Sequence, residues 1–283
     1  DQANIVRQLI SEGFTRESGI PVKLQFATGA LLPSTLAGIG PDVFLFAPSA
    51  EPINYALRGA VEPLDRFEGF ADVRARLSKQ AMVPYSYMGR VYAIPETEQF
   101  PMLFYRLDIL DELEISVPQT WDDVYNALSK LQGQNLSAGM LFDFTAYYMF
   151  LSQRGIPVYK ESGAAVGFDG KTGVSAFTQW TEFFTNYKLS TAYSFVNRFR
   201  TGEMALGIAD FSFANQLYVS APEIRGMWHM APLPGTASSS GEINRSAPIT
   251  STANIMLRQS GRKAEGWEFL RWWSSSGNQA RYA

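Results

Sequence analysis

Four acidic residues are the first candidates for chemistry. Glu96 and Glu98 lie two positions apart in the polar segment 95–100, between two apolar runs that are expected to be strands. Side chains two positions apart on a strand share one face, so the two carboxylates would lie side by side. Hydrolysis of a glycosidic bond needs carboxylates on opposite sides of the sugar, so a hydrolase would need a distant partner, Asp143 or Asp210. The alternatives are a solvated acidic turn and a ligand-binding role.

Composition excludes most other chemistry. The 283 residues include no cysteine and one histidine, His229, which excludes disulfides, thiolate nucleophiles and metal cages rich in cysteine or histidine. The sequence contains no G-x-G-x-x-G, G-x-x-x-x-G-K-[ST], H-E-x-x-H or EF-hand pattern, so no cofactor and no metal ion are expected. The formal net charge is −3, which leaves no basic excess to neutralise phosphates and argues against a nucleic-acid partner.

Aromatic residues at the ends of predicted strands are the strongest indication of binding. Ligands of open α/β sheets bind beyond the carboxyl ends of the strands, and flat rings stack well on the C–H faces of sugars. If one ring covers about 60 Å², burial at about 25 cal/mol/Å² gives roughly 1.5 kcal/mol. Micromolar affinity needs about 8 kcal/mol, so two or three rings and several hydrogen bonds would be required. The aromatic residues concerned are Phe44, Phe46, Phe142, Phe144, Tyr147, Tyr148, Phe211 and Phe213.

Helix and strand patterns alternate along the chain. Apolar residues at three- and four-residue spacing predict a helix over 2–17, and strict alternation predicts a strand over 20–26. The apolar run 42–46 is typical of a central strand, and a helix over 50–58 is expected after it. This alternation predicts an α/β fold, and the length is sufficient for two domains.

Short phrases in a fixed order resemble the family 1 extracellular solute-binding proteins of ABC transporters, the maltodextrin-binding type. Each phrase alone is weak, but together they cover nearly the whole chain. In this sequence they are Phe14-x-x-x-Ser18-Gly19-Ile20-x-Val22, Gly40-Pro41-Asp42-Val43, Gly59-Ala60-Val61-Glu62-Pro63-Leu64, Gly89-Arg90-Val91-Tyr92-Ala93-Ile94-Pro95-Glu96, Phe104-Tyr105-Arg106-x-Asp108-Ile109-Leu110, Pro118-x-Thr120-Trp121-Asp122-Asp123, Phe199-Arg200-Thr201-Gly202-Glu203-Met204-Ala205 and Ala264-x-x-Trp267-Glu268-Phe269-Leu270.

The resemblance implies a type II periplasmic-binding-protein-like fold, in which two α/β lobes joined by crossing hinge strands close over a ligand. By analogy lobe 1 comprises 1–98 plus 233–283, and lobe 2 comprises 99–232. Members of the family are not enzymes. They capture a solute, here a small-molecule carbohydrate, outside the cell and deliver it to the subunits of an ABC permease, and we expect a monomer.

The resemblance also implies ligand-binding residues, position by position. They comprise an acid after the first strand, a stacking ring and a polar contact after the second, a hinge-side polar pair, and two groups of acids and aromatics in lobe 2. In that order they are Asp1; Phe46 and Ser49; Glu98 and Gln99; Asp143, Phe144 and Tyr147; and Asp210, Phe211 and Phe213.

Two departures from the family pattern concern the ends of the sequence. The first strand of lobe 1 is missing before Asp1, and the last helices are missing after Ala283. We therefore expect a longer parent chain and a site that lacks a contact. The phrases resemble modules of large surface proteins of Gram-positive bacteria, which implies an extracellular lipoprotein anchored to the outer face of the membrane. No segment of the sequence is long and apolar enough to span the bilayer.

The leading hypothesis is an extracellular oligosaccharide-binding protein for ABC-transporter uptake. One alternative is a glycan-active enzyme that uses Glu98 with Asp143 or Asp210. The other is a surface or sensory scaffold domain whose cleft binds nothing.

Overall fold

The chain forms two compact units. The computed structural model describes residues 2–26, 31–161 and 164–282. The first unit comprises Asp1–Glu98 and Thr250–Ala283, and the second comprises Gln99–Ile249. The chain therefore passes from one unit to the other after Glu98 and again after Ile249. In the described part of the chain, no helix has the length and apolar character needed to cross a membrane.

The first unit is built on a three-stranded sheet. Its strands lie in the order β1 (Val43–Pro48), β13 (Thr250–Met256) and β4 (Ile94–Gln99), and β1 runs antiparallel to β13. A short hairpin pairs β2 (Ser86–Tyr87) with β3 (Arg90–Val91). The helical segments are α1 (Gln2–Leu9), η1 (Ile10–Phe14), α2 (Thr15–Ser18), α3 (Leu32–Leu36), α4 (Glu51–Leu57), η2 (Leu64–Arg66), α5 (Phe70–Ala75), α6 (Lys79–Met82), η3 (Val83–Tyr85), α13 (Lys263–Trp273) and α14 (Ser276–Tyr282).

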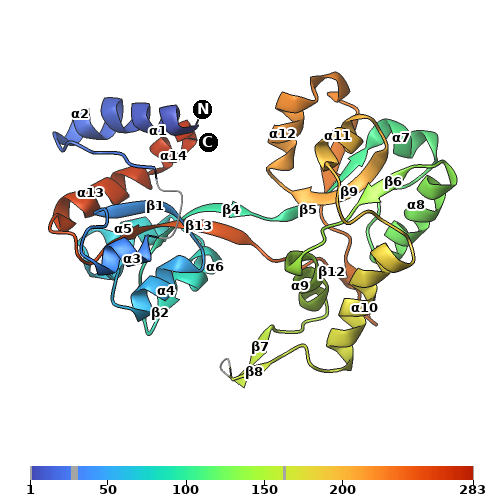
Figure 1. Cartoon of the computed structure of the whole chain (residues 1–283), viewed down its shortest axis with the longest axis horizontal. Helices are drawn as coiled ribbons and strands as arrows, with labels where there is room; N and C mark the ends of the chain where they lie inside the picture. Colours follow the sequence, from blue (N-terminus) through green and yellow to red (C-terminus); the bar gives the residue numbers. More distant parts are fainter. Residues whose placement is uncertain (1, 27–30, 162–163, 283) are drawn as a thin grey trace. The chain divides into compact units, whose positions relative to one another are not determined.

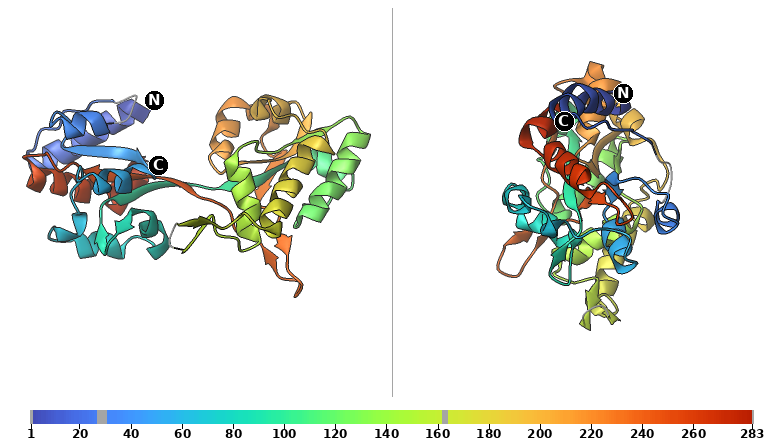
Figure 2. Two further views of the ribbon diagram at one scale, coloured as in Figure 1. Left: turned by 60° about the horizontal axis from the view of Figure 1, so that its bottom comes forward. Right: turned by 90° about the vertical axis from the view of Figure 1, so that its left-hand side faces the viewer.

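The amino-terminal helix packs on α13. The helix predicted over 2–17 is present, although its middle turn, η1, is a π-helix. Its apolar stripe is buried, and the Phe14 ring meets Phe269 edge-on with 5.1 Å between ring centroids. Helix α14 lies beside α1 in both figures (Figures 1 and 2). Helices α1 and α14 therefore pack against each other within the first unit.

Segment 20–26 differs from its predicted structure. It runs between α2 and α3 without regular structure, and no strand of the described residues pairs with it. Ile20, Val22 and Leu24 nevertheless pack against the core, as their alternation indicated. Alternation thus identified the buried face, but a strand also needs a neighbour for its backbone groups.

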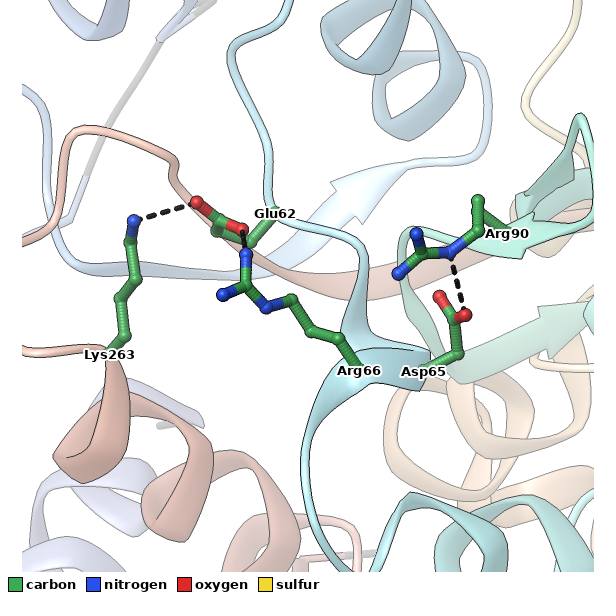
Figure 3. A network of polar contacts seen from close by, with 5 residues as sticks. All are labelled: Glu62, Asp65, Arg66, Arg90 and Lys263. Carbon is green, nitrogen blue, oxygen red and sulfur yellow. Dashed lines mark hydrogen bonds and ion pairs between the residues drawn. The ribbon is translucent and has the colours of Figure 1, made fainter.

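A buried carboxylate connects distant segments of the first unit (Figure 3). The Glu62 side chain is only 3% exposed, and it forms ion pairs with Arg66 at 2.9 Å and Lys263 at 2.7 Å. Beside it, Asp65 accepts from the Arg90 side chain at 2.7 Å and from the backbone N–H of Val91. The start of α13 is thereby tied to η2 and β3.

The second unit is built on a four-stranded sheet. Its order is β10 (Trp228–Ala231), β5 (Pro101–Arg106), β9 (Met204–Asp210) and β6 (Ser137–Gly139). β5 is antiparallel to both neighbours, whereas β6 and β9 are parallel. The helical segments are α7 (Leu107–Glu112), α8 (Trp121–Gly133), α9 (Phe144–Gln153), α10 (Lys171–Thr185), α11 (Phe195–Arg200), α12 (Phe213–Ser220) and η5 (Pro222–Ile224), and the hairpins are β7 (Tyr159–Lys160) with β8 (Ala165–Val166) and β11 (Thr236–Ala237) with β12 (Ile243–Asn244).

Helices cover both faces of this sheet (Figure 1). Leu103 of β5 belongs to the core with α8, α9 and α10, and its neighbour Phe104 packs with α11 and α12. Adjacent strand residues point to opposite faces, so one strand serves both cores. Helix α8 begins at a capping box, in which Thr120 accepts from the Asp123 N–H and Asp123 accepts from the Thr120 N–H.

Residues 233–249 lie in the second unit, whereas the sequence placed them in lobe 1. The reason is a set of hydrogen bonds to α9 and to the start of α8. The buried Gln153 side chain donates to the Pro234 carbonyl at 3.0 Å, and its oxygen accepts from the Thr236 hydroxyl. Gly235 donates to the Gln119 carbonyl at 2.9 Å. Hydrogen bonds of this kind do not affect the spacing of apolar residues, so hydrophobic periodicity could not predict them.

Candidate ligand-binding site

Four of the predicted residues lie at one edge of the first unit's sheet, three of them in the first unit and Gln99 at the point where the chain passes to the second. Because β13 pairs antiparallel with β1, the end of β1 lies beside the start of β13, with Pro48 opposite Thr252. The end of β4 reaches the same edge, where the Thr97 and Thr252 hydroxyls share a hydrogen bond of 2.8 Å. This edge carries Phe46, Ser49, Glu98 and Gln99.

Phe46 has a backbone conformation that bulky residues seldom adopt. Its φ is 59°, in the left-handed region, and it lies where the β1–β13 register shifts by one residue. Its half-buried ring stacks on Tyr282 with 5.5 Å between centroids and meets Trp273 edge-on at 6.1 Å. Strained backbone is concentrated at ligand-binding sites, so this conformation keeps Phe46 a candidate contact residue.

The polar residues of this edge have different surroundings. Ser49 is half-buried in the turn after β1, and Glu98 is exposed. Burial raises the pKa of Tyr85, and the negative charge of Glu98 raises it further, against the hydrogen bond from Ser251. The Gln99 side-chain oxygen is buried and has no hydrogen-bond partner within the described ranges.

The site residues predicted for lobe 2 lie at or near the corresponding edge of the second sheet. β6 and β9 are parallel, so their carboxyl ends meet there, and β5 begins there because Pro101 pairs with Asp210. Phe211 continues this pairing by donating its N–H to the Phe100 carbonyl at 2.9 Å.

The loop from β6 to α9 is held rigidly. The Tyr193 hydroxyl donates to the Met140 carbonyl at 2.9 Å, and the Trp180 indole donates to the Leu141 carbonyl at 3.1 Å. Burial raises the pKa of Tyr193 to about 12, so it remains a donor at neutral pH. Asp143 then caps α9, accepting from the N–H groups of Thr145 and Ala146.

Exposed aromatic rings flank this loop. Phe142 and Phe144 are each 54% exposed and Phe211 is 41% exposed. Each is supported from beneath by another ring. Phe142 packs edge-on against Phe184 at 4.8 Å, Phe144 stacks on Tyr148 at 6.2 Å, and Phe211 stacks on Phe100 at 5.4 Å. Exposed rings with such support are suited to stacking on a flat ligand.

A hollow of about 660 Å³ lies within the second unit, and of these rings Phe142 lines it. Asp210 lines it together with Tyr193, Ser194 and Gln216. Burial raises the pKa of Asp210 above its ordinary value, and the charge of Asp143 raises it further. The hollow therefore combines a carboxylate and neutral hydrogen-bonding groups with aromatic walls.

Two predicted residues lie inside the core. Tyr147 is 8% exposed, and its hydroxyl donates to the Gly173 carbonyl. Phe213 is 7% exposed and packs between Phe104 and Phe195. The Tyr147 ring supports the exposed Phe144 edge-on at 6.0 Å, whereas the Phe213 ring contributes to the wall of the hollow. Asp1 lies outside the described residues.

Sequence reasoning did not select Phe100, Tyr193 or Gln216. Phe100 directly follows the hinge-side Gln99, and that adjacency could have identified it. Tyr193 lies in an irregular segment, and no pattern in the sequence points to it. A cluster of three or more metal-binding side chains does not occur among residues 2–26, 31–161 and 164–282.

These features define a class of protein. Two α/β units, each with rings and polar groups at the carboxyl ends of its strands, are typical of a binding protein of the two-lobe type. The family model of the bacterial extracellular solute-binding proteins matches residues 1–280. The chain belongs to this family.

Solved structures share this fold. MalE, the sugar-binding protein of the phytopathogen Xanthomonas citri, superimposes with a TM-score of 0.86 at 20% identity, covering 100% of this chain and 75% of that one. The GacH receptor of Streptomyces glaucescens gives 0.79 at 20% identity, with coverages of 100% and 75%. Maltose-bound MalE3 of T. maritima gives 0.79 at 19% identity, with coverages of 99% and 76%. These likenesses confirm the predicted fold class. A comparison with curated proteins gives no match.

Proposed function

We propose that the protein binds an oligosaccharide outside the cell and delivers it to an ABC permease. The observation that carries the proposal is the set of exposed, supported rings beside carboxylates at the strand ends. Sugars present apolar C–H faces to such rings and hydroxyls to the carboxylates. Three solved relatives support the ligand class, since the X. citri protein is described as sugar-binding, the GacH receptor binds acarbose and MalE3 binds maltose.

The proposed contacts come from both units. At the edge of the first sheet they are Phe46, Ser49, Glu98 and the crossing residue Gln99, and at the edge of the second sheet they are Asp143, Phe144, Asp210 and Phe211. Asp1 stays a predicted contact as well, Tyr147 supports the Phe144 ring, and Phe213 forms part of the wall of the hollow. Three rings at roughly 1.5 kcal/mol each supply about half of the 8 kcal/mol that micromolar affinity requires. Hydrogen bonds to hydroxyls supply the remainder.

The proposal includes closure of the two units on the sugar, about the chain crossings at Glu98–Gln99 and Ile249–Thr250. In the cell the protein acts as a monomer, anchored to the outer face of a Gram-positive membrane, and presents the closed complex to the permease. X-ray scattering with and without maltotetraose tests closure. A profile unchanged at saturating sugar would favour a surface scaffold instead.

Isothermal calorimetry tests the ligand class. The probes are maltose, maltotetraose and acarbose, with a neutral hexapeptide and spermidine as controls. We expect saturable binding of at least one sugar and of neither control. At 100 times its Kd, that sugar adds about 2.7 kcal/mol to the free energy of unfolding. Failure of every sugar would overturn the proposal.

The second candidate function is a glycan-active enzyme that uses Glu98 with Asp143 or Asp210. Its support is the pKa of Asp210, which burial and the charge of Asp143 raise. Prolonged incubation with maltotetraose, followed by a reducing-sugar assay, separates the two functions. The binding proposal expects no release. Release that Asp210→Asn or Glu98→Gln abolishes would establish a hydrolase.

A further inference from the structure

A bulge decides which face of the first sheet carries the Phe46 ring. Phe44 pairs with Ile255 and Ala47 pairs with Ala253, so Leu45 and Phe46 together oppose the single residue Asn254. Simple alternation would put Phe46 on the same face as Phe44. With the extra residue, Phe46 instead joins the core of α13 and α14, whereas Phe44 remains in the opposite core.

The bulge is held by a buried side chain. The N–H of Phe46 donates to the Asn254 side-chain oxygen at 3.1 Å, and Asn254 is 0% exposed. The Asn254 amide nitrogen donates in turn to the carboxylate of Glu96 on β4. That carboxylate also accepts from the Trp273 indole at 2.9 Å and from the Gln279 amide at 3.2 Å.

The hydrogen-bonding capacity of its neighbours allows only one orientation of the Asn254 side-chain amide. An ionised carboxylate only accepts hydrogen bonds, so the NH₂ of Asn254 must face Glu96. The carbonyl oxygen of Asn254 then faces Phe46, whose N–H is a donor. If the amide turned over, two donors would meet at Phe46 and two acceptors at Glu96, each buried and unsatisfied.

We propose that Glu96 and Asn254 are positioning residues for ligand binding, because they hold Phe46 in its left-handed conformation and so place its ring at the sugar site. This role rests on the proposed function, since it takes Phe46 as a stacking ring. Neither residue needs to touch the sugar. Burial raises the pKa of Glu96, and the hydrogen bonds from Asn254, Trp273 and Gln279 oppose that rise.

Glu96→Gln tests the role with little change in size. The new amide at position 96 has one acceptor oxygen in place of two. When that oxygen faces Trp273 and Gln279, which both donate to the same oxygen of Glu96, its NH₂ meets the NH₂ of Asn254, and turning Asn254 over only moves the conflict to Phe46. We expect the affinity for maltotetraose to fall about tenfold, the equivalent of one stacked ring. When Asn254→Asp is added to Glu96→Gln, a donor again faces an acceptor in both contacts of residue 254, the one with the Phe46 N–H and the one with residue 96. We therefore expect this double variant to recover most of the affinity. If Glu96→Gln acted only by weakening the hydrogen bonds from Trp273 or Gln279, the change at position 254 would not restore the affinity.

A second readout does not depend on the ligand. The ¹³Cα and ¹³Cβ chemical shifts of Phe46 report its left-handed backbone. They should move toward extended values in Glu96→Gln and return in the double variant. Ser251→Ala is the matched control, because it removes the 2.7 Å Tyr85–Ser251 hydrogen bond from the same strand without touching Phe46. It should leave the shifts and the affinity unchanged.

The outcomes separate the two proposals. Shifts that stay left-handed in Glu96→Gln would overturn the positioning role whatever the ligand. If the Phe46 shifts move but the affinity for maltotetraose is unchanged, Glu96 and Asn254 position Phe46 without contributing to ligand binding, and the proposal is wrong. If no sugar binds the parent protein, the proposed function fails, and the shifts still test the backbone role. Should the double variant fail to fold, Glu96→Gln in a Phe46→Gly background replaces it. With the ring absent, Glu96→Gln should change the affinity less than twofold, and a tenfold loss there would contradict the role.

Discussion

Asp143 and Asp210 lie close enough that the charge of Asp143 raises the pKa of Asp210. The first caps α9 and the second ends β9, so parallel pairing of β6 and β9 brings their carboxylates to one edge. Two anions at one place repel each other, and a ligand hydroxyl that donates to them relieves this repulsion. The pair therefore offers several hydrogen-bond acceptors at one edge of the sheet.

This pairing predicts a pH dependence of binding. Burial and the charge of Asp143 raise the pKa of Asp210 above 3.8, so Asp210 takes up a proton earlier than an ordinary aspartate as the pH falls. A protonated carboxyl accepts hydrogen bonds less well. The affinity for maltotetraose, measured by calorimetry, should therefore fall as the pH drops toward 4. Asp210→Asn should bind more weakly at pH 7 and lose this dependence. If the affinity of the Asp210→Asn variant depends on pH as strongly as that of the parent, a group other than Asp210 causes the dependence.

The exposed rings predict a second set of changes. Phe144→Ala and Phe211→Ala each remove roughly 1.5 kcal/mol of stacking, so each should weaken maltotetraose binding about tenfold. Val219→Ala, at an 81% exposed position on α12, is the control and should bind as the parent does. Because both rings are exposed, the melting temperature should change little. Unchanged affinity in both ring variants would remove the second unit from the site.

Much of the second unit could be predicted from the sequence. The capping box at Thr120 and the amphipathic patterns of its helices are local features, so short stretches of sequence carry the signals for them. The direction of Phe213 could not be predicted, because it depends on Phe104 and Phe195, which come from other elements. The place of residues 233–249 depends on the side chain of Gln153, about eighty positions earlier.

The first unit shows the same limit more sharply. The apolar run ending at Phe46 predicted a strand, and β1 is present. Its bulge and the left-handed backbone depend on Asn254, which is 208 positions away. Local propensity opposes a left-handed phenylalanine, so only the tertiary contact explains it. The candidate site is therefore predictable as a set of strand ends, and the orientation of its rings is not.

Glu96 predicts a pH dependence of stability. Burial raises its pKa above 4.5 in the folded protein, and the neighbouring Tyr282 is uncharged in this range. Between 4.5 and the folded value, the folded state binds more protons than the unfolded state, so stability falls as the pH rises through that window. The free energy of unfolding, measured with urea for the parent and for Glu96→Gln, should contain this pH-dependent contribution in the parent only. A parent-minus-variant difference that rises with pH would contradict the sign.

The buried anion at Glu62 predicts an unequal response to removing its partners. Arg66→Met with Lys263→Met leaves a carboxylate that is 3% exposed without a cation, which should cost about 3 kcal/mol or more. Glu62→Met should cost less, because both cations are at least one-third exposed and can turn to water. Urea unfolding of the two variants measures the order. Lys160→Met, which breaks an exposed ion pair with Asp169, is the control and should change stability by less than about 1 kcal/mol. Equal losses in the two test variants would mean that packing, and not the buried charge, governs this region.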